Sequence, residues 1–293
     1  MPVVSVIIPS YNHADFLKQR IDSVFAQTFD DFEVIILDDC STDHSRDIIE
    51  EYHYHPKVKH VVYNEHNSGS TFIQWAKGIE LCTADLIWIA ESDDFTDPDF
   101  LSSLLPAMLS NEQLGIAYCQ SLSVNQHNEI IGNWYVYTES LSDTQFNSDF
   151  YMNGKDYIRN FLIHKNTIPN ASAVVFRKKY YEQAGGIETG VKYCGDWITW
   201  LKILLISDIY YHVRSLNYFR QHENSVIAQA VKHFDHTRYI EQYDRTMRKR
   251  FQFYLQENGG FDIDILNANH HYIMREDDEE QQFNLTMTTG NNL

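Results

Sequence analysis

Short apolar runs alternate with helical stretches in the first part of the chain, and this alternation constrains the fold more than any other feature. The apolar runs lie at residues 3–8, 33–37, 58–62 and 86–90, with apolar residues at helical spacing between them at 14–26, 45–54 and 71–81. This order predicts an α/β fold with a Rossmann-like, mostly parallel sheet flanked by helices. Because crossovers are right-handed, the loops after the strands should share one edge of the sheet, where such sheets bind ligands.

The second half of the chain follows a different pattern. Further strands are predicted at 115–119, 173–176 and 209–213, whereas residues 121–153 are polar and aromatic without clear periodicity. We expect irregular structure or short edge strands in that segment, which would form a surface facing the substrate.

The C-terminal part is predicted to be a helical extension followed by a tail. Residues 226–256 are rich in Arg, His and Tyr and favour a long helix packed back on the domain, whereas residues 257–293 are polar and acidic and are expected to be mobile. The basic cluster Arg248-Lys249-Arg250 is interpreted as a solvated helix face, with contact to anionic lipid or to a phosphate of the acceptor as the alternative.

Charge and cysteine content narrow the classes of partner. The 293 residues include 23 basic and 41 acidic side chains, and the net charge of −18 disfavours nucleic acid as a partner. An anionic substrate would therefore need a metal ion or a helix N-terminus. The four cysteines form no CxxC pair, and there is neither an export signal nor an apolar run of about 18 residues, so we expect a cytoplasmic protein.

Polar loops follow three of the predicted strands, and they carry the residues suited to chemistry. The loops are Pro9 to His13, Asp38 to Asp43 and Glu91 to Asp94. A carboxylate in the second loop can accept a hydrogen bond from the ring N–H of a base, and an aromatic side chain in the first can stack on that base. Two adjacent carboxylates in the third loop can supply oxygen ligands to Mg²⁺ or Mn²⁺.

These loops resemble the motifs of family 2 glycosyltransferases of GT-A fold. The resemblance is carried by VIIPSYN at 6–12, QTFDDFEVIILDDCSTD at 27–43 and AESDD at 90–94, with looser matches at 195–200 and 218–225. It implies a glycosyltransferase domain over 1–225, divided into a nucleotide-sugar-binding half (1–120) and a mixed, acceptor-binding half (121–225). It also implies transfer of a sugar with inversion, from a nucleotide diphosphate donor to an acceptor hydroxyl, with UDP- or dTDP-sugars favoured.

The resemblance assigns roles to individual residues. Asp39 would bind the base, in a pocket lined by Pro9 and Tyr11. Asp94 would be the direct metal ligand, and Asp93 would face the ribose or sugar of the donor as the second acid of the DXD-type element.

The remaining roles fall on two later residues. His222 would be a third metal ligand or a contact of the diphosphate, and Asp196 would be the general base. Asp196 opens a helical pattern, and a helix N-terminus would keep its carboxylate ionised.

Each of these assignments has a structural alternative. Asp93 and Asp94 could form only a loop and a helix cap, Asp39 could be a turn former, and Asp196 could be only an N-cap. With 14 histidines in the chain, His222 could fall in its motif by chance. Asp43 is better explained as a helix cap than as a ligand.

One segment departs from the family pattern. Many relatives carry an arginine after the third strand that contacts the donor, but residues 69–78 read GSTFIQWAKG and contain none. Gln74 or Lys77 are the candidates to replace it.

Two classes of function remain open. The first is an active, metal-dependent enzyme of cell-surface polysaccharide or O-antigen assembly, with a glycan or lipid-linked glycan acceptor and peripheral contact with the inner face of the membrane. The second is a non-catalytic GT-A module that binds a nucleotide sugar or glycan within a larger assembly. A dehydrogenase is disfavoured because no GxGxxG follows the first strand.

Overall fold

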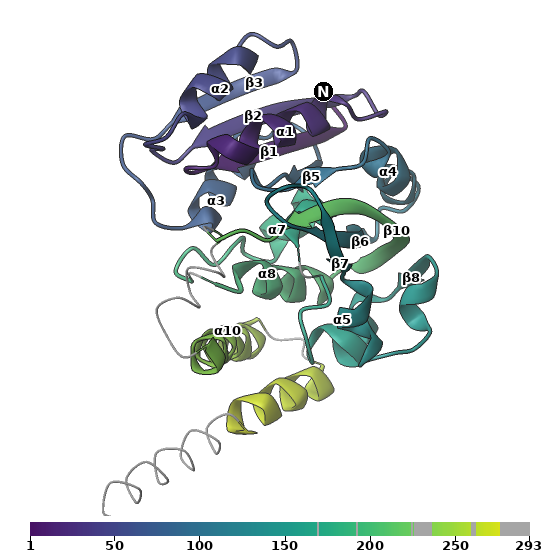
Figure 1. The fold of residues 1–293 in the computed structure, drawn as a ribbon. Helices are drawn as coiled ribbons and strands as arrows, with labels where there is room; N and C mark the ends of the chain where they lie inside the picture. Colours follow the sequence, from purple (N-terminus) through teal and green to yellow (C-terminus); the bar gives the residue numbers. More distant parts are fainter. Residues whose placement is uncertain (169, 192, 224, 226–235, 259–261, 276–293) are drawn as a thin grey trace, which may run out of the picture.

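A computed structural model describes residues 1–293 apart from 169, 192, 224, 226–235, 259–261 and 276–293. Its first part has the predicted alternation (Figure 1). The strands β1 (Val4–Ser10), β2 (Phe32–Asp38), β3 (Val58–Tyr63) and β4 (Leu86–Ile89) alternate with the helices α1 (Ala14–Phe25), α2 (Ser45–Tyr52) and α3 (Thr71–Leu81). The prediction for this part is confirmed to within a few residues at every boundary.

The second part adds antiparallel strands and short helices. Its elements are β5 (Phe95–Thr96), α4 (Phe100–Ser110), β6 (Leu114–Val124), β7 (Ile130–Asn133), α5 (Tyr135–Glu139), η1 (Gln145–Asn147), β8 (Phe150–Met152), α6 (Gly154–Tyr157), η2 (Ile158–Leu162), η3 (Ala171–Ala173), β9 (Val174–Arg177), α7 (Lys178–Gln183), α8 (Gly195–Leu204) and β10 (Asp208–Arg220). Short elements do fill residues 121–153, as expected. The predicted strands at 115–119 and 209–213 are the beginnings of the longer strands β6 and β10.

One mixed sheet of ten strands joins the two parts, in the order β3-β2-β1-β4-β9-β6-β10-β5, with β7 beside β6 and β8 beside β10. The pairs of β1 with β2 and β4 are parallel, whereas β9 runs antiparallel to both β4 and β6. The carboxyl ends of β1, β2 and β4 therefore lie together. The end of β10 reaches the same region by pairing with β5, which follows β4 directly.

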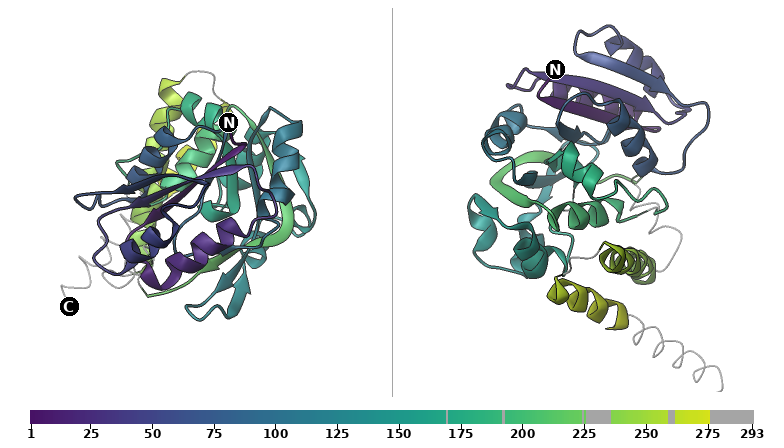
Figure 2. Two further views of the ribbon diagram at one scale, coloured as in Figure 1. Left: turned by 90° about the horizontal axis from the view of Figure 1, so that it is seen from above. Right: turned by 180° about the vertical axis from the view of Figure 1, so that it is seen from behind.

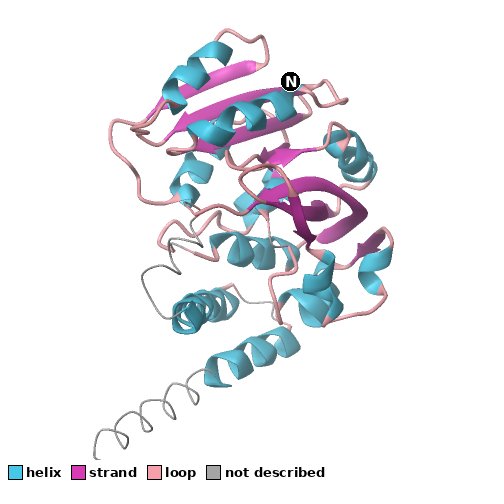
Figure 3. Cartoon of the chain, viewed as in Figure 1, coloured by secondary structure: helices cyan, strands magenta, loops and turns pink. Residues whose placement is uncertain are grey.

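Both faces of the sheet are covered, which explains why the strands are apolar on both sides. On β1, Ile7 faces a core that includes residues of α3 and α8, whereas Val6 and Ile8 face a core built with α1 and α4. Figures 2 and 3 show these helices on the two sides of the strands.

One buried carboxylate interrupts the apolar core at strand β2. Glu33 is only 3% exposed. Its Oε1 accepts hydrogen bonds from the Ser5 hydroxyl (2.6 Å) and from the backbone N–H (2.7 Å) and hydroxyl (2.9 Å) of Thr83. The carboxylate thus ties β1 and β2 to the loop before β4.

The C-terminal region contains one helix more than the sequence indicates. The predicted helix corresponds to α10 (His236–Glu257), with residues 226–235 outside the described residues. Residues 263–275 form a further helix in the segment expected to be a mobile tail, and the rest of that segment from 276 onward is outside the described residues. This helix packs back through Ile265, which is fully buried, and through Asn269, whose Nδ2 donates to the Arg248 carbonyl oxygen at 3.0 Å.

The interpretation of the basic cluster as a solvated helix face is wrong for Arg248. Its side chain is 1% exposed, it donates to the Ile163 carbonyl oxygen at 2.9 Å, and it lies over the rings of Trp197 and Tyr272. Periodicity alone could not reveal this, because the second helix that covers Arg248 was not predicted.

Two further expectations concern the chain as a whole. All four cysteines are free thiols, which agrees with the absence of CxxC pairs. Among the described residues, we find no helix with the length and apolarity needed to cross a bilayer.

Candidate active site

The loops after β1 and β2 are fastened to each other at the edge of the sheet. Asn12 adopts a left-handed backbone conformation (φ 54°), which an Asn tolerates better than most residues. Its N–H donates to Ser41 Oγ (3.0 Å) and its Oδ1 accepts from the Thr42 N–H (2.7 Å). Asp43 accepts from the backbone N–H groups of Ala14 and Ser45, so it bonds to the first residues of α1 and α2, although the N-cap residues of these helices are His13 and His44.

Asp39 lies at the end of β2 in a dense set of hydrogen-bond donors. Its carboxylate accepts from Asn64 Nδ2 (2.6 Å), from the N–H and hydroxyl of Ser68 (2.9 and 2.7 Å), from Gln74 Nε2 (2.9 Å) and from Asn67 Nδ2 (3.2 Å). These donors hold the carboxylate in one place. A base that bonds to Asp39 must therefore share or displace some of them.

The residues expected beside Asp39 lie at the same edge. Pro9 is buried in β1 next to Leu37, whereas Tyr11 is 45% exposed and so offers a ring face to a ligand. The two candidates to replace the missing arginine both reach this region from α3. Gln74 contacts Asp39 directly, and Lys77 Nζ donates to Asn64 Oδ1 at 2.5 Å.

Asp93 is grouped with two histidines rather than with Asp94. One ligand atom each from His13, Asp93 and His222 lie within 4.8 Å of one another. His222 Nε2 is 3.1 Å from Asp93 Oδ2, and His13 Nδ1 is 2.8 Å from Ser92 Oγ. Two imidazoles and a carboxylate suit a divalent transition metal.

The electrostatics of this cluster favour an ionised Asp93. Burial alone would raise the pKa of Asp93, but His13 and His222 outweigh it and lower the pKa below its usual range. The Asp93 side chain keeps 20% of its surface exposed, so the carboxylate is both charged and accessible.

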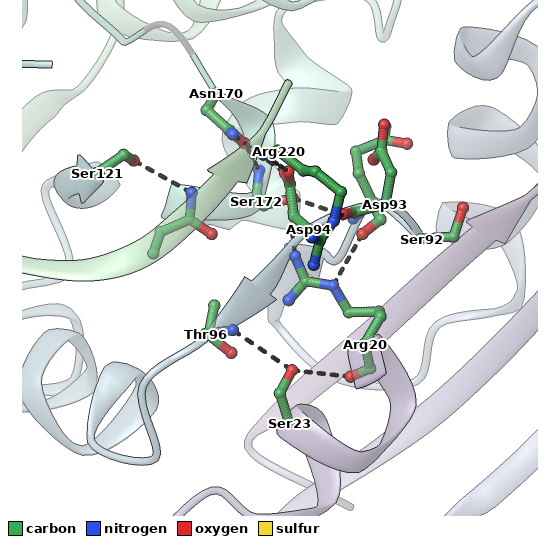
Figure 4. Close-up of polar contacts among 12 residues, drawn as sticks. Arg20, Ser23, Ser92, Asp93, Asp94, Thr96, Ser121, Asn170, Ser172 and Arg220 are labelled. Carbon is green, nitrogen blue, oxygen red and sulfur yellow. Dashed lines mark hydrogen bonds and ion pairs between the residues drawn. The ribbon is translucent and has the colours of Figure 1, made fainter. Parts of the chain in front are cut away.

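Asp94, which is predicted to be the direct metal ligand, lies in a different environment from Asp93. It is 2% exposed, its Oδ1 accepts from the Arg220 N–H (2.9 Å), and its Oδ2 accepts from Asn170 Nδ2 (3.0 Å). Arg20, which is fully buried, approaches Oδ2 to 4.0 Å. Figure 4 shows the Asp94 side chain among these groups. Burial and the charge of Asp93 raise the pKa of Asp94.

Arg220 links Asp94 to the group of His13, Asp93 and His222. Its Nε donates to the Asp93 carbonyl oxygen (2.7 Å), and its guanidinium lies over the ring of Phe16, 4.6 Å from the centroid. Because Arg220 ends β10 and His222 follows it, these contacts fix His222 relative to Asp93.

The participants that sequence reasoning missed include His13, Glu91 and Arg20. Arg20 donates to the Glu91 carbonyl oxygen at 2.8 Å. Its helix buries Leu17, Ile21 and Val24, and an arginine in phase with that apolar face was the available signal. Glu91 accepts from Trp75 Nε1 (2.6 Å), and burial together with Asp93 raises the pKa of Glu91 to about 8.

Asp196 is the second residue of α8, as predicted from the pattern. Its Oδ2 accepts from Asn166 Nδ2 at 3.1 Å. The expectation that the helix start decides its ionisation is wrong in direction. Burial raises the pKa of Asp196 and outweighs the backbone N–H groups and Asn166, which lower it. A carboxylate with a raised pKa is a stronger base, which suits proton abstraction.

The architecture is the GT-A fold of glycosyltransferases. Residues 1–349 of S. aureus TarS, solved in complex with UDP-GlcNAc, superpose with a TM-score of 0.70 at 17% identity, over 92% of this chain and 70% of that one. The mannosyltransferase PcManGT of Pyrobaculum calidifontis, solved with GDP-Man and Mn²⁺, gives a TM-score of 0.62 at 15% identity, over 94% of this chain and 73% of that one.

Within that class, the chain belongs to glycosyl transferase family 2, whose model matches residues 5–185. Among curated proteins it is similar to TuaG of Bacillus subtilis (strain 168), which is provisionally named a teichuronic acid biosynthesis glycosyltransferase. The identity is 40% over 108 residues, which make up 37% of this chain and 42% of TuaG. The matched segment therefore spans less than half of that relative.

Proposed function

We propose that this protein is a metal-dependent, inverting glycosyltransferase that moves a sugar from a nucleotide diphosphate donor, a UDP- or dTDP-sugar, to an acceptor hydroxyl in surface-polysaccharide assembly. The observation that carries the proposal is the cluster of His13, Asp93 and His222 beside the loop of Asp39, at the edge where β1, β2 and β4 end. Similarity to TuaG supports the biological setting. The free cysteines fit a reducing compartment, so we place the reaction in the cytoplasm.

The donor would be bound by the loops after β1 and β2. Asp39 accepts from the N–H of the base, Pro9 and Tyr11 line its pocket, and Lys77 lies near enough to Asn64 to approach the donor from α3. Gln74 holds the Asp39 carboxylate from behind. In this assignment Gln74 fixes the base-reading acid, and Lys77 supplies the positive charge that the missing arginine would bring.

The cation would be held by Asp93 and the two histidines, which changes the division of labour between the paired acids. Because two of the three ligands are imidazoles, Mn²⁺ fits this set better than Mg²⁺, and a bound Mn²⁺ would supply the positive charge that neutralises the departing diphosphate. Asp93 and His222 position that charge, and His13 completes the ligand set. Asp94 does not ligate in this assignment. It pins the loop to β10 through Arg220.

The chemical step is a single displacement. The carboxylate of Asp196 removes the proton from the acceptor hydroxyl as the acceptor oxygen bonds to the anomeric carbon of the donor. The bond from that carbon to the phosphate oxygen breaks, and the nucleoside diphosphate leaves with the electron pair. Attack from the face opposite the leaving group inverts the anomeric centre.

The proposal is tested by measuring binding of UDP-, dTDP- and GDP-sugars by calorimetry with and without Mn²⁺, followed by donor turnover and NMR of the anomeric product. Asp93→Asn should lose metal-dependent binding, whereas Asp196→Asn should bind the donor and lose transfer. Asp264→Asn is the matched control, because this acid is exposed on the C-terminal helix. Failure of every nucleotide sugar to bind would favour the non-catalytic module that binds glycan. A retained anomeric configuration would exclude a single displacement by the acceptor oxygen with Asp196 as its base.

A further inference from the structure

A groove of about 390 Å³ opens beside the candidate active site, between β7, α5 and the residue that follows β10. This volume lies in the range of small-ligand sites. Trp134 and Tyr137 supply aromatic surface, and Ser123, Asn133 and Gln221 supply hydroxyl and amide groups. We call this hollow the β7–α5 groove.

The position of the β7–α5 groove relates it to both reacting ends of the site. At one end, Gln221 is fixed by its N–H to the Val124 carbonyl oxygen and by its Nε2 to Ser123 Oγ, each at 2.8 Å. The next residue is His222, which contacts Asp93. The groove therefore begins one residue from the proposed metal cluster.

The other end of the groove leads to the proposed base. Lys165 Nζ donates to the Tyr137 carbonyl oxygen at 2.6 Å, and the next residue, Asn166, donates to Asp196 at 3.1 Å. Burial, followed by the charges of Asp244 and Asp196, raises the pKa of Tyr137, which is consistent with its closeness to Asp196. Residues that line the groove are thus linked through Gln221 to the cluster of His13, Asp93 and His222 and through Tyr137 to Asp196, the two groups between which an acceptor hydroxyl is required.

The lining indicates the chemistry of that ligand. Among the described residues that line the groove, none carries a charge. Lys165 is close, but its ammonium is taken up by the Tyr137 carbonyl oxygen and the Tyr137 ring, 3.7 Å from the centroid. An anionic sugar in the groove would find no cationic side chain in the lining to pair with, and the net charge of −18 would repel it. The lining therefore disfavours an anionic sugar.

A neutral sugar matches the same lining. The apolar C–H face of a pyranose can lie on an aromatic ring, and its hydroxyl groups can bond to amides. Asn133 Oδ1 accepts from the Tyr135 and Val136 N–H groups, which directs its NH₂ group outward as a donor, and Gln221 presents its carbonyl oxygen because its NH₂ group is bonded to Ser123.

We infer that the β7–α5 groove binds an uncharged sugar residue of the acceptor and holds its hydroxyl toward Asp196. The inference deepens the proposed function and rests on it. It distinguishes an acceptor ending in a neutral hexose or N-acetylhexosamine from one that presents a uronic acid or a phosphate.

Gly132 offers a way to close the groove without disturbing the fold. It pairs with Ser123 across the strands, and a Cβ added to it would meet only Ser123 Cβ, at 3.9 Å. The Cβ of Gly132→Leu should therefore fit at an ordinary contact distance, and we expect the rest of the leucine side chain to fill part of the groove. Ile130→Leu, on the same strand and outside the lining, is the matched control.

The test is calorimetry of the full chain with UDP and Mn²⁺ present, against neutral probes (diacetylchitobiose, lactose and maltose) and acidic ones (a hyaluronan disaccharide and glycerol phosphate). We expect a neutral probe to bind, Gly132→Leu to weaken that binding by about tenfold or more, and Ile130→Leu to leave it unchanged. Tyr137→Ala, checked for its unfolding temperature, should weaken it similarly by removing an aromatic face.

The inference is overturned if the acidic probes bind better, if Gly132→Leu and Tyr137→Ala leave neutral binding intact, or if no neutral probe binds. UDP binding by the parent protein separates the two proposals. If UDP binds and no sugar probe does, only the inference about the β7–α5 groove is refuted. If no nucleotide binds, the proposed function on which that inference rests is refuted as well.

Discussion

Replacing Asp94 by Asn should lower the free energy of unfolding and leave the affinity for Mn²⁺ largely intact. Asp94 accepts from Asn170 and from the Arg220 N–H, and it is the acid nearest the buried Arg20 guanidinium, at 4.0 Å. An amide in its place keeps the shape but loses the charge. Its NH₂ group would also face the NH₂ group of Asn170, a donor against a donor.

The expected cost follows from the burial of the partners. Arg20 is 0% exposed, and two of its nitrogen atoms, Nη1 and Nη2, have no hydrogen-bond partner among the described residues. Burial already lowers the pKa of Arg20 to about 10. Removing the nearest counter-charge from a buried ion typically costs about 3–5 kcal/mol. Because the contact is long, and because the raised pKa of Asp94 means that its ionised form costs stability at pH 7, we expect less than that range, about 1–2 kcal/mol, or a fall of roughly 2–8 °C in Tm for a chain of this size.

The assay pairs two measurements on three proteins. Urea unfolding followed by circular dichroism gives the free energy of unfolding, and calorimetry gives the affinity for Mn²⁺, for the parent, Asp94→Asn and Asp93→Asn. Asp93→Asn should show the opposite result for the metal. Its affinity for Mn²⁺ should fall by about 10-fold or more because a charged ligand is lost, and its free energy of unfolding should also fall, by about 1–2 kcal/mol, because the lowered pKa of Asp93 means that its charge stabilises the folded state.

The reverse outcome would refute this reasoning. If Asp94→Asn lost Mn²⁺ binding with a stability change under about 0.5 kcal/mol, and Asp93→Asn kept Mn²⁺ binding, Asp94 would be the ligand as the family resemblance implies. The hydrogen bonds to Asn170 and Arg220 would then be replaced when the ion binds.

Three other predictions concern the base and the core. The transfer rate should fall on acidification at a pH above the ordinary Asp value of about 3.9, because the buried Asp196 has a raised pKa and must be ionised; a rate that is flat down to that pH contradicts the assignment. Asp196→Asn should not destabilise the protein at pH 7. Because the pKa of Asp196 is raised in the folded state, the folded protein loses stability as this carboxyl ionises with rising pH. A lower Tm of the variant would show that the charge has a structural partner. Glu33→Ala should lower the free energy of unfolding in urea by about 1–3 kcal/mol, because the Thr83 N–H and its neighbouring hydroxyls lose their acceptor. Glu33→Gln keeps an acceptor and should lower it by less. Equal losses of free energy in the two variants would mean that the negative charge matters and the hydrogen bonds do not.

The layered fold was predictable because local pattern and tertiary burial agree there. Runs such as 3–8 and 33–37 are apolar on both faces, and the structure buries both faces under helices. The helix at 263–275 was not predictable in the same way. This helix is held in place by the burial of Ile265 and by the hydrogen bond from Asn269 to α10. These are long-range contacts, and the polar sequence of the segment does not indicate them.

The candidate site shows the same division at finer scale. The loops that contain Asp39 and Asp93 could be found because they follow strands and match family motifs. The group around Asp93 could be found only in part: His222 was predicted as a metal ligand from its motif, whereas His13 is 209 positions away from it in the numbering (222 − 13) and meets it only when β10 pairs with β5. Arg20 likewise looks like an ordinary helix residue until its guanidinium is seen beside Asp94.

The sequence by itself determined the α/β alternation, the family and the strand-end acids, since these depend on periodicity and on motifs of consecutive residues. Only the tertiary structure decided which of the two adjacent acids joins the histidines and which is buried against arginine. Neighbouring side chains after a strand point in different directions, so Asp93 and Asp94, identical in type, acquire opposite pKa shifts from opposite surroundings.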